Sequence, residues 1–427
     1  MTERKQAPHR TAIRDFRLYW AASTTDAMGS QASGLVLPLF LLAAGYSPAL
    51  AGAVVSLSMA AGLLAAPFAA VFADRGARRR TMWWSALVAA GAMGLVAALA
   101  VGGRLPLALL VSAVLVERVA TSCYSAAAKG CVAALASPAD YPRAVSRLQA
   151  GEQGAVVVGP VLGGVLFQVA RWLPFLADAL SYLVAAWCVR AIRSDLEPGR
   201  PAGPATRAVG LRSVLADLGE SLRFTWRQPF LRSVLLWAAG VNGALAALYY
   251  AVLFTLQRQG TPAAAIGLVL AVTGAAGLAG ALAAPWLARR IPTARLVRTV
   301  SWTTVPVAVA LALVERVWWY GALFGAVSLL VPTLSVLLAA RAIAVTPLGL
   351  QSRVGTALAT ASGITAAAAP AAAGVLVALA GTSATALVCA AALALLAGYA
   401  SVTVARRIGT ASPGAPAEAA TALGETP

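Results

Sequence analysis

Four ionisable residues in the first half of the sequence stand within or beside stretches that are otherwise almost free of charge. They are Asp26, Glu117, Arg118 and Glu152. A charged group inside a membrane is costly, so such a residue is a functional candidate by default. A carboxyl group in a partly desolvated cavity can bind and release a proton, and a nearby arginine can shift that balance when substrate binds. We therefore predict that Asp26 and Glu152 are proton carriers.

Glu117 and Arg118 allow two interpretations. They either take part in transport or form a buried ion pair that fixes helix packing. In the second case Glu117 pairs with Arg118 or with Lys129. Because a permanent pair would keep Glu117 ionised, we rank it below Asp26 and Glu152 as a proton carrier. Asp178 stands close to the end of its apolar stretch, and we expect it to serve packing rather than transport.

Two apolar stretches carry their polar residues on one side. In the first stretch, spacings of four, three, four and three residues place five side chains on one helix face: Tyr19, Ser23, Asp26, Ser30 and Ser33. The other stretch has a broader polar face, made of Glu117, Arg118, Thr121, Ser122, Tyr124, Ser125 and Lys129. We expect both faces to line a water-filled cavity, with Tyr124 among the candidate residues.

The second half of the sequence offers a different surface. Between Ser221 and Ala417 the only acidic residue is Glu315, so any carboxyl that binds protons has to lie in the first half. Asn242 and Tyr249, seven residues apart and on one helix face, are candidate cavity residues. Other Trp and Tyr residues stand near the ends of stretches, where they typically form an interfacial belt. A half without buried acids suits an apolar or amphipathic substrate.

The composition excludes a water-soluble globule. Of the 427 residues, 60% are apolar and only 11% are charged, and the mean hydropathy is +0.79. A membrane-spanning helix needs about 20 apolar residues, and such stretches recur at 18–43, 49–72, 82–102, 105–134, 145–169, 173–192, 231–256, 263–287, 297–314, 317–346, 354–379 and 383–405. We predict an all-α polytopic membrane protein with twelve transmembrane helices in two pseudo-symmetric six-helix bundles. The long fourth and tenth stretches must tilt, kink or extend beyond the bilayer.

The two halves are joined by the only long internal polar segment. It begins with a cluster of Pro and Gly and continues as an amphipathic run over 211–227, which is typical of an interfacial helix. Pro160-x-x-x-Gly164 in the fifth stretch recurs as Pro370-x-x-x-Gly374 in the eleventh, which indicates an internal repeat. The predicted domains are a cytosolic tail (1–17), a bundle (18–193), the linker (194–229), a second bundle (230–406) and a disordered cytosolic tail (407–427).

The distribution of charge predicts the orientation in the membrane. Lys and Arg number 33 against 15 Asp and Glu, which gives a formal charge of +18. Basic residues in short loops are retained on the cytosolic side. They cluster in the N-terminal tail, the linker and alternate loops, whereas the other side has only Arg104, Arg171, Arg258 and Arg316. We predict a plasma-membrane protein with both termini in the cytoplasm, and no nucleic-acid partner.

The loop at 70–80 carries an acidic residue followed by spaced arginines: Asp74, Arg75, Arg78 and Arg79. It resembles the loop signature of the major facilitator superfamily, Gly-x-x-x-Asp-Arg-x-Gly-Arg-Arg, with alanine in place of both glycines. An aspartate here can face the positive end of a neighbouring helix dipole while the arginines pair across the loop. Such a contact can latch the two halves and be released when they rock. Alternatively, the arginines serve only as topology anchors.

The fifth stretch contains a run of glycines around a proline: Gly159, Pro160, Gly163 and Gly164. This run is similar to the Gly-Pro-x-x-Gly-Gly core of the antiporter motif in drug–proton exporters of the superfamily. The proline bends the helix, and the glycines allow a neighbouring helix to approach closely. The similarity favours export over import, although membrane helices also use Gly and Pro for packing alone.

The resemblance extends from residues 15–20 through 217–224 to 351–354, and it is greatest to the branch that contains the enterobactin exporter and macrolide efflux proteins. It implies proton-driven export of a small organic molecule by alternating access. The sequence has no Gly-x-x-x-x-Gly-Lys-Ser/Thr loop, and its sole histidine is His9 in the tail. We therefore expect a monomeric transporter without enzymatic activity, metal or cofactor, whose partners are a small molecule, protons and the bilayer. The alternatives are a metabolite importer or facilitator on the same fold, and a non-transporting membrane scaffold.

Overall fold

The computed structural model describes residues 3–74, 78–103, 106–137, 139–196, 211–314, 316–346 and 350–404. The regular elements in these ranges are all helices. Eleven of them are long and apolar enough to span a bilayer. The last, α13, is interrupted at Gly381, which has a φ of 78° that glycine adopts without steric cost. Since the chain spans the bilayer once on each side of this break, the structure confirms the predicted fold of twelve transmembrane helices.

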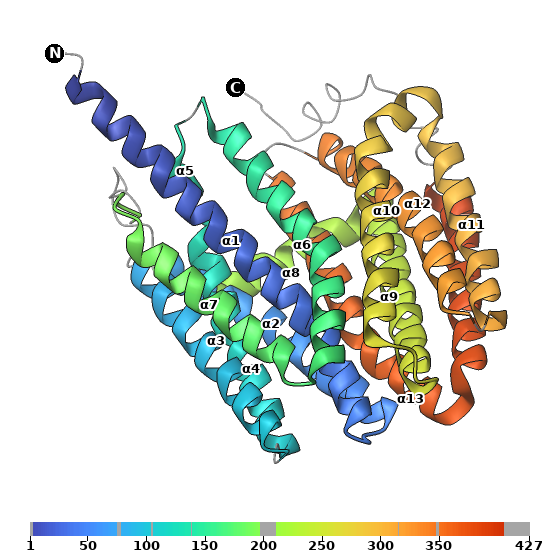
Figure 1. Cartoon of the computed structure of the whole chain (residues 1–427). Helices are drawn as coiled ribbons and strands as arrows, with labels where there is room; N and C mark the ends of the chain where they lie inside the picture. The colour runs from blue at the N-terminus through green and yellow to red at the C-terminus, as the bar shows by residue number, and fades with distance from the viewer. Residues whose placement is uncertain are drawn as a thin grey trace, which may run out of the picture.

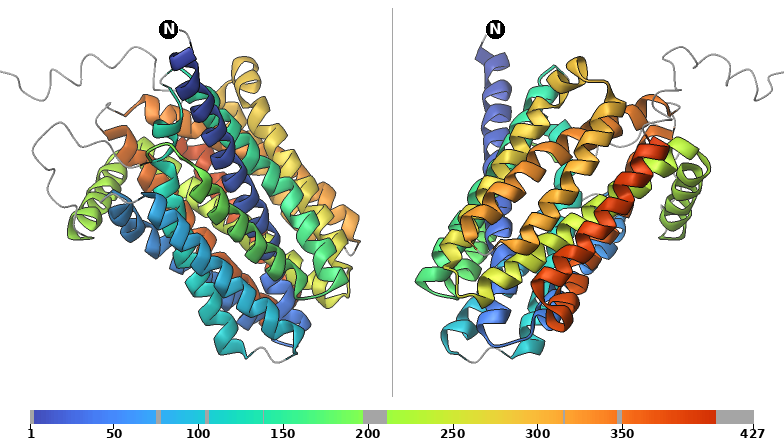
Figure 2. Two further views of the ribbon diagram at one scale, coloured as in Figure 1. Left: turned by 60° about the vertical axis from the view of Figure 1, so that its left-hand side comes forward. Right: turned by 90° about the vertical axis from the view of Figure 1, so that its right-hand side faces the viewer.

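The helices fall into two groups in Figure 1. The N-terminal group contains α1 (Glu3–Ala43), α2 (Pro48–Asp74), α3 (Arg78–Val101), α4 (Leu107–Lys129), the one-turn α5 (Val132–Leu135), α6 (Tyr141–Val169) and α7 (Leu173–Ala191). The C-terminal group contains α9 (Pro229–Arg258), α10 (Ala263–Arg290), α11 (Thr293–Leu313), α12 (Val317–Ala344), α13 (Gln351–Tyr399) and a π-helical end (Ala400–Val404). The amphipathic α8 (Leu211–Arg227) lies on the outside of the bundle (Figure 2), against α13, α9 and α2.

The helix bounds differ from the predicted stretches at two places. The predicted fourth span, 105–134, is divided, because α4 ends at Lys129 and a turn at Gly130 precedes α5. The first helix begins at Glu3, within the residues predicted to form a tail. The tail predicted at 407–427 and much of the linker, 197–210, lie outside the described residues.

The loops divide between two ends of the bundle. We call one the Arg-rich end, because it holds the starts of α3, α6 and α11 and their neighbouring arginines. The other, here the opposite end, holds the turns at 44–47, 170–172 and 259–262. Figure 1 shows α6 and α10 side by side at the opposite end and diverging toward the Arg-rich end.

The two halves meet through two equivalent interfaces, α6 with α10 and α2 with α13. In the first, Gly164 faces the backbone carbonyl of Ala263, and Gly267 faces that of Pro160. In the second, the counterpart of Gly164 is Gly374, which faces the carbonyl of Pro48 in the same way. A side chain at these glycines would collide with the opposing backbone. The repeat seen in the sequence therefore corresponds to a repeated close contact between the halves.

We expect Gly164→Val to destabilise the α6–α10 interface, because the new side chain must push against the backbone of Ala263. Overpacking of this kind costs about 1–3 kcal/mol. The matched control is Gly154→Val in the same helix, since Gly154 has open space around it and surface changes usually stay within about 0.5 kcal/mol. Thermal unfolding of the two purified variants measures the difference. Equal stability of the two variants would contradict the packing role of Gly164.

Candidate functional site

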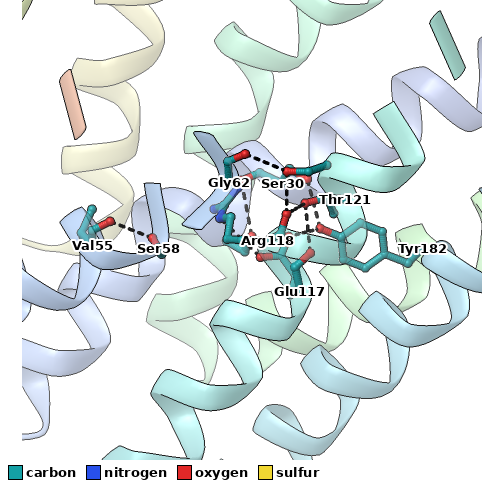
Figure 3. Close-up of polar contacts among 10 residues, drawn as sticks. Ser30, Val55, Ser58, Gly62, Glu117, Arg118, Thr121 and Tyr182 are labelled. Carbon is teal, nitrogen blue, oxygen red and sulfur yellow. Dashed lines mark hydrogen bonds and ion pairs between the residues drawn. The ribbon is translucent and has the colours of Figure 1, made fainter. Parts of the chain in front are cut away.

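Glu117 of α4 is the centre of a polar cluster that joins three helices of the N-terminal half. It is only 3% exposed. The hydroxyl of Tyr182 in α7 donates a hydrogen bond of 2.7 Å to Glu117 Oε1, while Glu117 Oε2 lies 3.4 Å from Arg118 Nε. Figure 3 shows the ring of Tyr182 and the Arg118 side chain on either side of the carboxylate. Ser30 Oγ of α1 lies 3.2 Å from the same Tyr182 hydroxyl.

The other polar residues of α4 tie the helix to its surroundings. The hydroxyl of Thr121 donates to the carbonyl of Glu117 at 3.0 Å, one turn back in the same helix. Ser122 Oγ lies 3.2 Å from the carbonyl of Gly62, which connects α4 to α2. Arg118 keeps 30% of its side chain exposed, whereas the Glu117 side chain keeps 4%. Arg118 is thus the more exposed side chain of the pair.

Asp26 and Tyr124 lie beside this cluster. Asp26 of α1 is half-buried and interacts electrostatically with Glu117 and Arg118. Tyr124 is only 4% exposed, so it packs in the core rather than lining an open cavity. Its hydroxyl has no hydrogen-bond partner among the described residues, and it interacts electrostatically with Asp26 and Tyr19. The polar face predicted for the first stretch therefore points toward α4 and α7.

The structure adds Asp178 and Tyr182 of α7 to the cluster. Asp178 is 0% exposed and interacts electrostatically with Glu117 and Asp26. Sequence reasoning gave Asp178 a packing role and did not single out Tyr182. A spacing of four residues places both on one helix face. A pair of polar residues with this spacing inside an apolar stretch is the sequence feature that could have identified them.

Glu152 stands apart from the cluster. Its side chain is exposed and accepts a hydrogen bond of 3.2 Å from Gln149 Nε2. One turn further along α6, Val156 packs against Gly274 of α10. Glu152 therefore lies on the side of α6 that faces α10, where the two helices diverge toward the Arg-rich end (Figure 1).

The C-terminal half contributes aromatic groups from α9. Tyr250 interacts electrostatically with Arg118, so it faces the cluster across the boundary between the halves. The ring of Tyr249 packs edge-on against that of Tyr250, with 5.0 Å between centroids. Asn242 is exposed, and its amide donates a 3.0 Å hydrogen bond to the carbonyl of Ala238. Of the two predicted cavity residues of this half, Tyr249 contacts Tyr250, which interacts with Arg118.

The arginines of the loop motif bind backbone carbonyls within the N-terminal half. Arg78 Nη1 donates to Gly130 O at 2.9 Å, and Arg79 Nη2 donates to Ser194 O at 2.6 Å. The same segment is held by Asp15, whose Oδ2 accepts a 2.7 Å hydrogen bond from Ser194 N. Arg75 and the side chain of Asp74 lie outside the described residues. The described bonds of this motif fasten α3 to the ends of α4 and α7.

The glycines of the predicted antiporter motif all stand at close helix contacts. Gly159 faces Gln31 of α1, and Gly163 faces the backbone of Ala32. Gly164 faces α10 on the other side of the helix. The helix around Pro160 is thereby packed between its own half and the other half. Within the described ranges, no group of three or more His, Cys, Asp or Glu side chains is placed to hold a metal ion.

Two similar six-helix halves with ionisable side chains buried in one of them define a secondary transporter. Residues 19–344 match the Major Facilitator Superfamily, and the chain belongs to this family. No curated protein matches the sequence.

Solved structures of transporters share the fold at low sequence identity. A bacterial homologue of the iron transporter ferroportin in the inward-facing state has a TM-score of 0.68 and 17% identity, over 93% of this chain and 99% of that chain. A bacterial homologue of the human lysosomal transporter Spinster, inward-facing and unoccupied, has a TM-score of 0.70 and 14% identity, over 93% and 97%. A mutant of the nucleoside transporter NupG has a TM-score of 0.68 and 10% identity, over 90% and 98%. These similarities show the fold alone.

We expect Glu117→Ala to be strongly destabilising, because it leaves the Arg118 guanidinium and the Tyr182 hydroxyl without their buried acceptor. Removing one partner of a buried ion pair costs about 3–5 kcal/mol. The control is Glu152→Ala, which removes an exposed carboxylate and should change stability by less than about 0.5 kcal/mol. Thermal unfolding in one detergent compares them. If both variants unfold at the same temperature, Glu117 does not hold α4 and α7 together.

Proposed function

We propose that the chain exports a small apolar or amphipathic organic molecule across the plasma membrane in exchange for protons, by alternating access of the two halves. The observation that carries this proposal is the cluster of carboxyl groups around Arg118. Carboxyl groups buried inside a membrane bundle mark proton relays in pumps and transporters. The cluster lies in the half that holds the acids, and Tyr250 faces it from the other half.

Asp26 is the first proposed proton carrier. It is half-buried and interacts with both Glu117 and Arg118, so its charge state changes the field at the cluster. Glu117 is not a proton carrier in this scheme, since both of its oxygens have partners. Glu152 is the second proposed carrier, and its exposed position where α6 and α10 diverge suits proton exchange with water.

The direction of transport is supported by sequence motifs and by the arrangement of the halves. The similarity to the antiporter motif and to the branch of exporters favours efflux. With the predicted orientation, the Arg-rich end faces the cytosol, and the contacts of Gly164 and Gly374 close the opposite end. A cavity that opens to the cytosol is the state in which an exporter takes up its substrate. Two of the similar solved structures are also inward-facing.

The C-terminal half supports an apolar or amphipathic substrate. Tyr249 and Tyr250 present aromatic rings beside Arg118, and Asn242 adds one exposed amide. Aromatic side chains with a few polar groups are typical of sites for organic molecules. We propose that Arg118 contacts the substrate from the N-terminal half while these three residues contact it from the other half.

We expect a pH gradient to drive transport in proteoliposomes when protons are concentrated on the side that receives the substrate. Asp26→Asn should remove this gradient-driven component, because an amide cannot carry the proton. Asp140→Asn is the matched control, since Asp140 is exposed in the loop before α6. The assay follows the flux of a hydrophobic cation, a macrolide and a siderophore. If Asp26→Asn keeps the response to the gradient, or if no compound responds in the wild type, the proposal is wrong.

A further inference from the structure

Asp178 is a membrane-buried carboxyl group that the proposed mechanism does not use. It lies five residues after the start of α7 and is 0% exposed. Its side chain packs directly against Gly29 of α1, so that a Cβ atom added there would lie 2.6 Å from Asp178 Oδ1. Ser181 Oγ donates its 2.8 Å hydrogen bond to the backbone carbonyl of Asp178 and lies 3.5 Å from Oδ1. Oδ2 has no hydrogen-bond partner among the described residues.

Among the residues that the structure describes, the only cation that acts on Asp178 is already paired with another carboxylate. The groups that act on it electrostatically are Glu117, Asp26 and Arg118, with Ser33 as a polar neighbour. Arg118 is already paired with Glu117. The hydroxyl of Tyr182, on the same helix, donates to Glu117 instead. Three carboxyl groups therefore share one guanidinium.

The described parts of the helices that pack against α7 place no other positive charge near Asp178. By backbone proximity these helices are α1, α3 and α6. Their remaining charged residues with described side chains lie toward the Arg-rich end, within 14–17 of α1, 78–80 of α3 and 143–152 of α6. Helix α4 also reaches α7, through the bond between Glu117 and Tyr182, and its remaining charged residue, Lys129, is exposed at the end of the helix. Asp178 is close to the opposite end of the bundle. An ionised carboxylate in this place would be buried with only the hydroxyls of Ser33 and Ser181 beside it and no described cation of its own, a situation that membrane proteins avoid by neutralising the group.

The geometry points to Asp178 as a further proton-binding carboxyl of this transporter, beside Asp26 and Glu152, which holds its proton in the present state while Glu117 stays paired with Arg118. This inference rests on the proposed function and extends it, because Asp178 would add one proton per cycle to those that Asp26 and Glu152 carry. When Asp178 releases its proton, the oxygen keeps the electron pair of the O–H bond. The proton passes to water that reaches α7 once α1 moves away from it. Gly29 is the point at which that separation must occur, because α1 there closes directly over the carboxyl.

The protonation of Asp178 can be read from the infrared spectrum of the full-length protein in lipid vesicles at neutral pH. We expect a carbonyl band of a protonated carboxylic acid that is absent in Asp178→Asn and present in Asp140→Asn. Labelling aspartate with carbon-13 at its carboxyl group should shift the same band both in the wild type and in Asp26→Asn, which keeps the test valid even if Asp178→Asn fails to fold. A spectrum in which neither the substitution nor the label changes this band would overturn the inference.

The number of protons moved tests the second part of the inference. In proteoliposomes that transport tetraphenylphosphonium or erythromycin, Asp178→Asn should lower the number of protons exchanged per molecule by one, whereas Asp140→Asn should leave it unchanged. An unchanged ratio in Asp178→Asn would show that Asp178 is not a carrier. If the wild type moves neither compound against protons, the proposed function fails for these probes, and the infrared band still decides the charge state of Asp178.

Discussion

A charge inside a membrane bundle has to be balanced by a partner in the same apolar surroundings, and here one guanidinium serves three carboxyl groups. Arg118 is paired with Glu117, which Tyr182 also holds by a short hydrogen bond. Asp26 and Asp178 lie within electrostatic reach of this pair. Since these charges are largely buried and close together, the protonation of one carboxyl depends on that of the others. Hydrogen bonds through Tyr182 link α1, α4 and α7 at this cluster.

The same helices meet the other half of the protein through close backbone contacts rather than through charge. Gly164 and Gly374 place α6 against α10 and α13 against α2 at the opposite end of the bundle. Within α6, Gly159 and Gly163 bring the helix against α1, which carries Asp26. Helix α6 therefore contacts both the other half and the helix that carries Asp26. When the halves move during alternating access, α6 can transmit that movement to the surroundings of the charge cluster.

Much of the fold follows from the sequence, because apolar length and Arg-rich loops determine the number of spans and their order. The repeat of Pro160-x-x-x-Gly164 also indicated two duplicated halves, and the structure shows that its glycines make equivalent contacts. The neighbours of Glu117 were harder to predict, since its partner Tyr182 is 65 residues away and no local pattern fixes how α4 and α7 rotate against each other. The sequence suggested only a packing role for Asp178, because the residue stands near the end of its apolar stretch. That position does not show which neighbouring helix covers the side chain.

The most direct measurement is the release of protons on substrate binding by the purified protein in weakly buffered detergent solution. For whichever of the hydrophobic cations, macrolides and siderophores it binds, the wild type should acidify the solution, because the substrate displaces protons from the carboxyl cluster. A variant with both Asp26→Asn and Asp178→Asn should bind and release fewer protons, because only Glu152 of the proposed carriers remains. Binding by the wild type that releases no proton, or equal release by the double variant, would contradict the account.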